Sequence, residues 1–248
     1  MGSLQGQNVV VVGGSRGVGR SIVEVALGEG ATVLAVARGE PSLAKLAKEV
    51  RGVRTLAVDA TADSAPDKVV AALQPDVLVI CAGALAPSAP LQEQSWEGFS
   101  ANWESDVKAS FLFCQAALQG RLKPGTRVVL ISSGAALSGG PPFAGGYAGA
   151  KRTQMFLAGH CQKESDRLGL GLRFMALAPA RIMPKTGVGD AGIDSFSAYM
   201  GVPPADVLAS MSDMQTPADV ARAVVALVTD QLPGSSFVVS GSGLAAAA

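Results

Sequence analysis

The sequence predicts an α/β protein built as one domain, with helices on both faces of a doubly wound parallel sheet of about seven strands. Three observations support this fold class. Short continuous apolar runs alternate with helix-patterned segments along the chain. Hydrophobic residues make up 48% of the 248 residues and charged residues 16%, which supplies enough apolar material for a buried core. No composition shift or internal repeat divides residues 1–248, so we expect a single domain.

The expected strands and helices alternate in chain order. We expect strands at 7–12, 32–37, 54–58, 77–81, 127–132, 172–178 and 237–240. We expect helices at 17–29, 42–51, 65–73, 95–119, 146–169 and 217–229, with Thr216 as the N-cap of the last one. Residues 183–206 are rich in Gly, Pro, Ser and Met and fit neither pattern. The alanine tail after Leu244 predicts no element.

Charge and composition argue against several classes of protein. The 20 basic and 20 acidic residues balance, so nothing favours a nucleic-acid partner or a membrane surface. The longest apolar runs are too short to span a bilayer, and the first residues do not resemble a signal peptide. The three cysteines, Cys81, Cys114 and Cys161, contain no Cys-x-x-Cys pair. We therefore expect a cytoplasmic protein without disulfides or a metal site, and we assign no role to the single histidine, His160.

A glycine-rich turn follows the first expected strand. The segment VVVVGGSRGVGR places Gly13, Gly17 and Gly19 between that strand and a helix. Glycines let the backbone turn sharply and approach a ligand closely. The start of the helix offers free N–H groups and the positive end of a dipole to a pyrophosphate. The turn therefore predicts a dinucleotide site, with a glycine spacing that differs from the commoner G-x-G-x-x-G.

A phenol and an ammonium group lie one helical turn apart after a stretch that cannot be helical. Residues 139–151 read GGPPFAGGYAGAK, so Tyr147 and Lys151 share one face of the expected helix. A phenol ordinarily has a pKa near ~10, and a nearby ammonium lowers it toward neutrality. The pair therefore indicates a general acid–base group.

Several motifs in order resemble those of the short-chain dehydrogenase/reductase family, in its type of about 250 residues with a Tyr-x-x-x-Lys pair. The family's glycine turn corresponds to residues 12–19 and its Asn-Asn-Ala-Gly to residues 80–83. Its Ser upstream of the Tyr corresponds to Ser133, and its later Pro-Gly corresponds to Pro179 and Ala180. The resemblance covers the whole chain and implies a Rossmann-like fold.

The resemblance also implies roles for individual residues. Tyr147 would transfer a proton, Lys151 would support it and reach the ribose of the nicotinamide, and Ser133 would orient the substrate oxygen. Asp106 in SDVKAS replaces an Asn that is thought to hold a relay water, and it adds a charge near Lys151 unless it is protonated. The family's bracing Thr and Asn are replaced by Val12 and Cys81. The implied cofactor-binding residues are Gly13, Ser15, Arg16, Gly17, Val18, Gly19, Arg38, Asp59, Ala60, Ala82, Gly83, Tyr147, Lys151 and Ile182.

Two arginines bear on the choice of cofactor. The second strand ends with Ala37 where an acid would favour NAD, and Arg38 follows it. Arg16 lies in the glycine turn. Two guanidinium groups suit a 2′-phosphate, so we expect NADP(H) in preference to NAD(H). The alternative is that both arginines are ordinary solvated surface residues.

The expected activity is hydride transfer between NADP(H) and a small carbonyl or alcohol substrate. Residues 183–206 would form a lid, with Met183, Ile193, Phe196, Tyr199 and Met200 lining a site for a hydrophobic or extended substrate; alternatively, they pack the lid onto the body. Two other functions remain open. A dinucleotide-binding sensor or scaffold without turnover would explain the changes at positions 12, 81 and 106. A C=C reductase is disfavoured because such relatives usually space Tyr and Lys more widely.

The two long helices have more apolar positions than one core-facing stripe requires. Phe99, Trp103, Phe111, Met155 and Phe156 cannot obviously all point inward. Relatives commonly pair through these helices, so we expect a homo-oligomer, with a tetramer favoured. The alternative is that the extra apolar residues pack under the lid.

Overall fold

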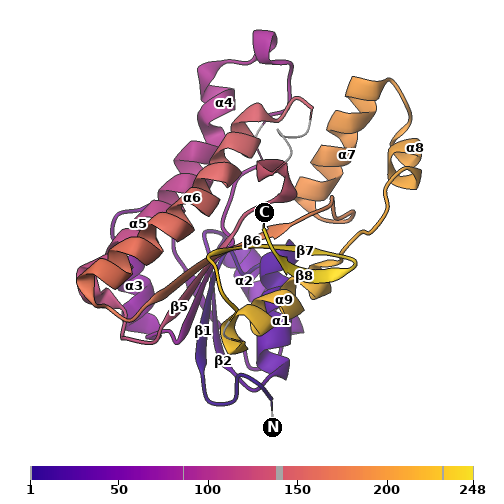
Figure 1. The fold of residues 1–248 in the computed structure, drawn as a ribbon. Helices are drawn as coiled ribbons and strands as arrows, with labels where there is room; N and C mark the ends of the chain where they lie inside the picture. Colours follow the sequence, from indigo (N-terminus) through magenta and orange to yellow (C-terminus); the bar gives the residue numbers. More distant parts are fainter. Residues whose placement is uncertain (1, 86, 138–141, 231, 248) are drawn as a thin grey trace.

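The seven expected strands form one sheet in the computed structural model, which describes residues 2–85, 87–137, 142–230 and 232–247. The sheet has eight strands in the order β3-β2-β1-β4-β5-β6-β7-β8 (Figure 1). The strands are β1 (Asn8–Val12), β2 (Thr32–Ala37), β3 (Arg54–Ala57), β4 (Val77–Ile80), β5 (Arg127–Ile131), β6 (Arg173–Pro179), β7 (Ser236–Ser240) and β8 (Gly243–Ala246). The first seven pair in parallel, which confirms the predicted fold class.

The eighth strand is a correction to the sequence analysis. The tail after Leu244 was expected to contribute no element, but β8 pairs antiparallel with β7, with Leu244 opposite Val239. Alanine is a poor strand former, so its own preference does not explain this pairing. The edge of β7 offers unpaired backbone groups, and the returning chain satisfies them.

Helices cover both faces of the sheet. They are α1 (Gly17–Gly28), α2 (Glu40–Glu49), α3 (Ala65–Ala72), α4 (Trp96–Asn102), α5 (Lys108–Ala116), α6 (Gly145–Leu168), α7 (Gly187–Met200), α8 (Pro204–Ala209) and α9 (Pro217–Thr229). Side chains of α1, α2 and α9 pack in one core cluster, and those of α3, α5 and α6 pack in another on the opposite face. The core therefore has two layers separated by the sheet, as expected for buried parallel strands.

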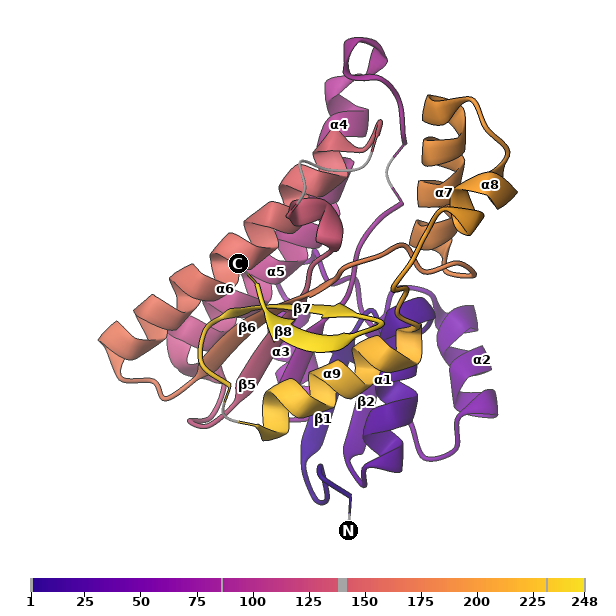
Figure 2. The ribbon, with the colours of Figure 1, turned by 45° about the vertical axis from the view of Figure 1, so that its right-hand side comes forward.

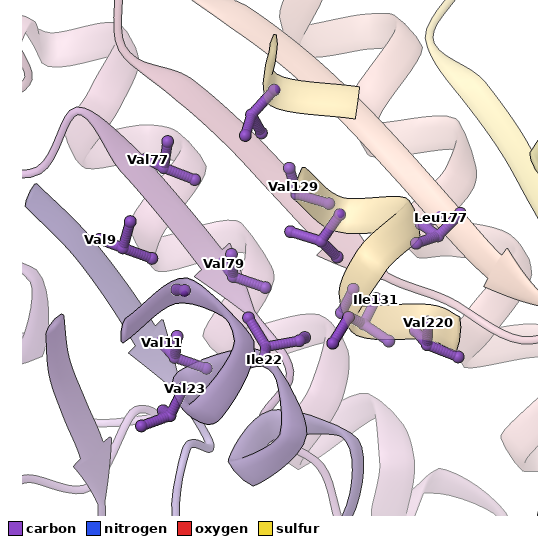
Figure 3. Packing of buried hydrophobic residues seen from close by; sticks show 14 of the residues in the cluster. Val9, Val11, Ile22, Val23, Val77, Val79, Val129, Ile131, Leu177 and Val220 are labelled. Carbon is purple, nitrogen blue, oxygen red and sulfur yellow. The ribbon is translucent and has the colours of Figure 1, made fainter. Parts of the chain in front are cut away.

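Alternation along the strands divides the valines between the two layers. Val9 and Val11 of β1 lie in the first cluster with Ile22 of α1, as Figure 3 shows. Val10 and Val12 lie in the second cluster with Phe113 of α5. Both faces of β1 are buried, which explains why its sequence is continuously apolar.

The long helix expected at 95–119 is interrupted. A π-helical turn, Trp103–Val107, separates α4 from α5, and a second, Ala117–Arg121, follows α5. A π-helical turn inserts an extra residue and so shifts which side chains face inward. Asp106 in the first turn is buried, whereas Trp103 at its start is exposed. The π-helical turn therefore determines that Asp106 points into the interior and Trp103 toward solvent.

The irregular stretch 183–206 contains α7 and the start of α8. Thr186 caps α7, because its hydroxyl accepts a hydrogen bond from the amide of Gly189 at 3.0 Å. Both helices lie beyond the carboxyl ends of the strands, apart from the layer formed by α1 and α9 (Figure 2). In the part of the chain that the structure describes, no helix is long and apolar enough to cross a membrane.

Candidate active site

A cavity of about 1100 Å³ opens at the carboxyl ends of the strands. It lies where the strand order reverses between β1 and β4, the usual ligand position in doubly wound sheets. All the predicted catalytic and cofactor-binding residues line it: Gly13, Ser15, Arg16, Gly17, Val18, Gly19, Arg38, Asp59, Ala60, Ala82, Gly83, Asp106, Ser133, Tyr147, Lys151 and Ile182. The fold therefore brings together segments that are far apart in the sequence.

The glycine turn has the shape that ligand approach requires. Gly13 has a φ of 90°, and a Cβ atom there would lie 2.6 Å from the amide nitrogen of Ala82. At Gly17, with a φ of 54°, a Cβ atom would meet nothing within 4 Å, so open space lies over that backbone. Arg16 at the start of α1 makes no side-chain cap. The turn fits a phosphate group that accepts hydrogen bonds from the first amides of α1.

Arg16 and Arg38, which the sequence predicts near the adenosine of a cofactor, line the cavity. Both side chains are exposed, and the charge of Arg38 acts on Asp59, which also lines the cavity. Hydrogen bonds from Thr61, backbone first, outweigh desolvation and lower the pKa of Asp59 below its usual value. Ser42, which the sequence analysis did not select, also lines the cavity and donates to the carbonyl of Gly39 at 2.8 Å. These residues therefore give the cavity polar lining and two cations.

The chemically active side chains come from β5 and α6. Ser133 follows β5, and its hydroxyl accepts a hydrogen bond from the amide of Ala135 at 3.2 Å. Tyr147 lies in the first turn of α6, and the Nζ of Lys151 lies 5.7 Å from the centroid of its ring. The hydroxyl of Ser132 donates to the carbonyl of Lys151 at 2.8 Å, which fastens α6 to the end of β5. Of the Gly- and Pro-rich residues before α6, 138–141 lie outside the described residues.

Asp106 forms a buried ion pair with Lys151. The distance from Lys151 Nζ to Asp106 Oδ2 is 3.0 Å, and the residues are 7% and 1% exposed. The other carboxylate oxygen accepts hydrogen bonds from the Ala84 amide at 3.0 Å, the Asn102 side chain at 3.1 Å and the Ser105 hydroxyl at 2.7 Å. Such satisfaction is what a buried charge requires. Asp106 is thus held as a carboxylate.

The charges of the pair support each other. Burial opposes the ionised form of Asp106, but the Lys151 charge and the three hydrogen bonds outweigh it and lower the pKa of that carboxyl. Burial also opposes the ammonium of Lys151, but the attraction of Asp106 raises its pKa above the usual lysine value. Burial raises the pKa of the nearby Cys81 thiol to about 11, so this residue is neutral at ordinary pH. The site therefore holds one cation and one anion side by side.

The lid segment contributes apolar side chains to the lining of the cavity. Met183, Phe196 and Met200 of the lid segment line it, as the sequence analysis expected. Ile193 is instead buried, and Tyr199 packs its ring edge-on against Phe143 at 5.4 Å, so neither lines the cavity. Leu85, Pro87, Gln94 and Phe99 also line it and were not selected. Their only sequence signal is their position after β4, at the reversal of strand order.

A parallel sheet with a cavity at this reversal is the architecture of dinucleotide-binding α/β proteins. A family model described as short chain dehydrogenase matches residues 7–189. The chain therefore belongs to the short chain dehydrogenase family. Membership supports an oxidoreductase that interconverts carbonyl and alcohol groups with a nicotinamide dinucleotide.

Three relatives show how far the similarity extends. A short chain dehydrogenase from Pseudocercospora fijiensis is 30% identical over 240 residues, which cover 90% of this chain and 76% of that protein. A 2,5-dichloro-2,5-cyclohexadiene-1,4-diol dehydrogenase from Sphingobium indicum is 28% identical over 261 residues, covering 99% and 97%. An L-xylulose reductase from Bos taurus is 29% identical over 129 residues, about half of each chain.

We predict that Asp106→Asn destabilises the protein by about 3 kcal/mol near neutral pH, because it leaves the buried Lys151 without its counter-charge. The folded-state pKa of Asp106 is lowered, so its contribution is present above the ordinary carboxyl value of ~3.9 and lost as the pH falls through the folded value. Urea unfolding of wild type and variant should therefore differ less as the pH drops below about 4.

Asp67→Asn is the matched control, because the ion pair of Asp67 with Arg121 is exposed to solvent. It should change stability little at any pH. If the Asp106→Asn difference stayed constant down to low pH, its source would be packing and not the carboxylate charge.

Proposed function

We propose that the chain uses NADP(H) to reduce a carbonyl compound to an alcohol, or catalyses the reverse reaction, with Tyr147 as the proton donor or acceptor. The observation that carries the proposal is the shared cavity. Ser133, Tyr147 and Lys151 line the same space as the glycine turn before α1. A protein that only bound a dinucleotide would have no use for a phenol beside an ammonium at this place.

The bound cofactor would supply or accept the hydride, and this chain's own residues would do the rest. Tyr147 would give its hydroxyl proton to the substrate oxygen in reduction and take it back in oxidation. Ser133 would hold that oxygen by a hydrogen bond. The charge of Lys151 would favour the phenolate form of Tyr147, and Asp106 would keep Lys151 charged and in place. The open backbone at Gly17 supports a fit for the diphosphate.

The substrate would be a mainly apolar carbonyl or alcohol compound. Met183, Phe196 and Met200 of the lid segment line the cavity together with Leu85 and Phe99. The names of the relatives, a cyclic diol dehydrogenase and a xylulose reductase, agree with a hydroxyl or ketone substrate. We treat residues 183–206 as a lid within one domain of residues 1–248, and we expect the protein to work in the cytoplasm.

A second candidate is a dinucleotide sensor or scaffold without turnover. The buried charge of Asp106, in place of the family's neutral Asn, is the observation that favours it. The first prediction below separates the two functions.

We predict that Tyr147→Phe lowers carbonyl reduction by roughly 10²–10⁴-fold, because it removes the transferable proton. Binding of NADPH, followed by fluorescence, should stay nearly unchanged. Tyr199→Phe is the matched control, since Tyr199 is the only other tyrosine and does not line the cavity. A Tyr147→Phe enzyme with more than about a tenth of wild-type turnover would contradict this assignment. Wild-type protein that binds NADPH but reduces no ketone or aldehyde in a broad panel would favour the sensor.

We predict tighter binding of NADPH than of NADH, because Arg16 and Arg38 can hold a 2′-phosphate. Arg38→Asp should weaken NADPH binding by at least about tenfold and spare NADH. Arg51→Asp, a charge reversal at an exposed residue that does not line the cavity, should leave both affinities unchanged. Equal wild-type affinity for the two cofactors would make the arginines ordinary surface residues.

We also propose a homo-oligomer, with a tetramer as the favoured form. Trp103, Phe111 and Phe156 on the π-helical turn, α5 and α6 are 39%, 48% and 66% exposed. Of the other two residues that the sequence analysis grouped with them, Met155 is buried in the core and Phe99 is half-buried at the cavity. The three exposed rings do not pack beneath the lid, and a second copy of the chain would cover them.

Light scattering should accordingly give a mass that is a multiple of 25.0 kDa, and Phe156→Glu should lower it. Glu164→Gln, further along the same helix and also solvent-accessible, is the control and should leave the mass unchanged. Wild-type protein with the mass of one chain at micromolar concentration would contradict the proposal.

A further inference from the structure

The ammonium of Lys151 has no proton left to give. Its Nζ donates to the carbonyl of Ile131 at 3.1 Å and to Gln154 Oε1 at 3.0 Å, and it pairs with Asp106 Oδ2 at 3.0 Å. An ammonium has three N–H donors, and the protein supplies an acceptor for each. Two of these acceptors come from segments already linked to the site. The Ile131 carbonyl is at the end of β5, next to Ser132, and Asp106 stands where the family has an Asn. The third, Gln154, belongs to none of the motifs.

The amide of Gln154 is fixed in one orientation. The residue is fully buried one turn along α6 from Lys151, and its Nε2 donates to the hydroxyl of Ser110 at 2.8 Å. That hydroxyl donates its own proton to the carbonyl of Asp106 at 2.8 Å, so it can only accept from Gln154. The nitrogen of the amide must therefore face Ser110 and its oxygen must face Lys151. A flipped amide would set two acceptors against each other and point N–H groups at an ammonium.

We infer that Gln154 is a positioning residue of the active site, which holds the Lys151 ammonium in place against Tyr147 through its side-chain oxygen. The inference rests on the proposed function for its meaning in catalysis. Gln154 joins α6 to α5 through Ser110, Asp106 joins α6 to the π-helical turn, and the Ile131 carbonyl belongs to β5. Three elements besides α6 therefore fix the same nitrogen. The positive charge that Lys151 presents to Tyr147 is thereby held in one position.

The charge of Lys151 is influenced by titratable groups from three elements. The groups that act on Lys151 are Asp106 from the π-helical turn, Cys81 from the end of β4 and Tyr147 from α6 itself. The Cys81 thiol is neutral, because burial raises its pKa to about 11. Asp106 is therefore the carboxylate whose charge offsets that of Lys151. A ribose contact from Lys151 would require one of the three present bonds to be given up.

The test is a titration of the Tyr147 hydroxyl without cofactor or substrate. In a Tyr199→Phe background, Tyr147 is the only tyrosine, so tyrosinate absorbance reports on it alone. Gln154→Met keeps the length of the side chain and removes the acceptor. A buried ammonium that loses an acceptor shifts toward the neutral amine and stabilises a phenolate less. We expect the midpoint of the titration to rise by about one pH unit, a ~tenfold change in the ionisation constant.

Gln162→Met is the matched control on the same helix. Its amide accepts from Phe174 N and donates to the carbonyl of Leu172, away from Lys151. It should lower the free energy of unfolding and leave the midpoint where it was. An unchanged midpoint in Gln154→Met, or an equal rise in both variants, would overturn the inference.

Ser110→Ala gives a second reading if Gln154→Met does not fold. It removes the acceptor that orients the amide and leaves the Lys151 and Tyr147 side chains in the sequence, so it should raise the midpoint by a smaller amount. No rise would count against the inference. Because the titration needs no turnover, a protein that reduces no carbonyl can still show the role of Gln154, and the reverse also holds.

Discussion

The buried ion pair between Asp106 and Lys151 is the constraint on which the arrangement of the site depends. Removing two charges from water costs several kcal/mol for each ion, and their attraction offsets this only when the remaining hydrogen-bonding groups are satisfied. Here one carboxylate oxygen accepts hydrogen bonds from Ala84, Asn102 and Ser105, and the other pairs with the ammonium itself. The two remaining ammonium protons are donated to Ile131 and Gln154. The pair is therefore tolerable only in this one geometry, and it fixes the position of α6 relative to the π-helical turn.

This constraint links the fold to the chemistry. The segment after β4 supplies Ala84, the end of β5 supplies the Ile131 carbonyl, and α6 carries both Tyr147 and Lys151. These ends meet because parallel strands finish at the same edge of the sheet. The π-helical turn then rotates Asp106 inward at that edge. A neutral residue at position 106 would not supply the negative charge that raises the pKa of the buried Lys151.

The sequence could predict those features that depend on local pattern. Each of these features depends on residues close together in the sequence: the continuous apolar strands, the glycine turn, and the four-residue spacing of Tyr147 and Lys151 on one helix. The fold class predicted from them is confirmed. Features set by tertiary contact could not be predicted. The π-helical turn, the strand β8 and the burial of Met155 depend on neighbours brought together by the sheet. The sequence gives no signal for the role of Gln154, because that role depends on its hydrogen bonds with Ser110 and Lys151 in the folded protein.

The central claim is that the protein itself holds Lys151 charged and in place before any cofactor binds. Nitrogen NMR of the lysine side chains in the free protein tests it most directly, with the Lys151 signal identified by its loss in Lys151→Met. We expect one ammonium signal whose protons exchange slowly with water, and which persists past the ordinary lysine value of ~10.4 as the pH is raised. A Lys151 signal that exchanges as fast as surface lysines, or that loses its charge well below that pH, would contradict the account.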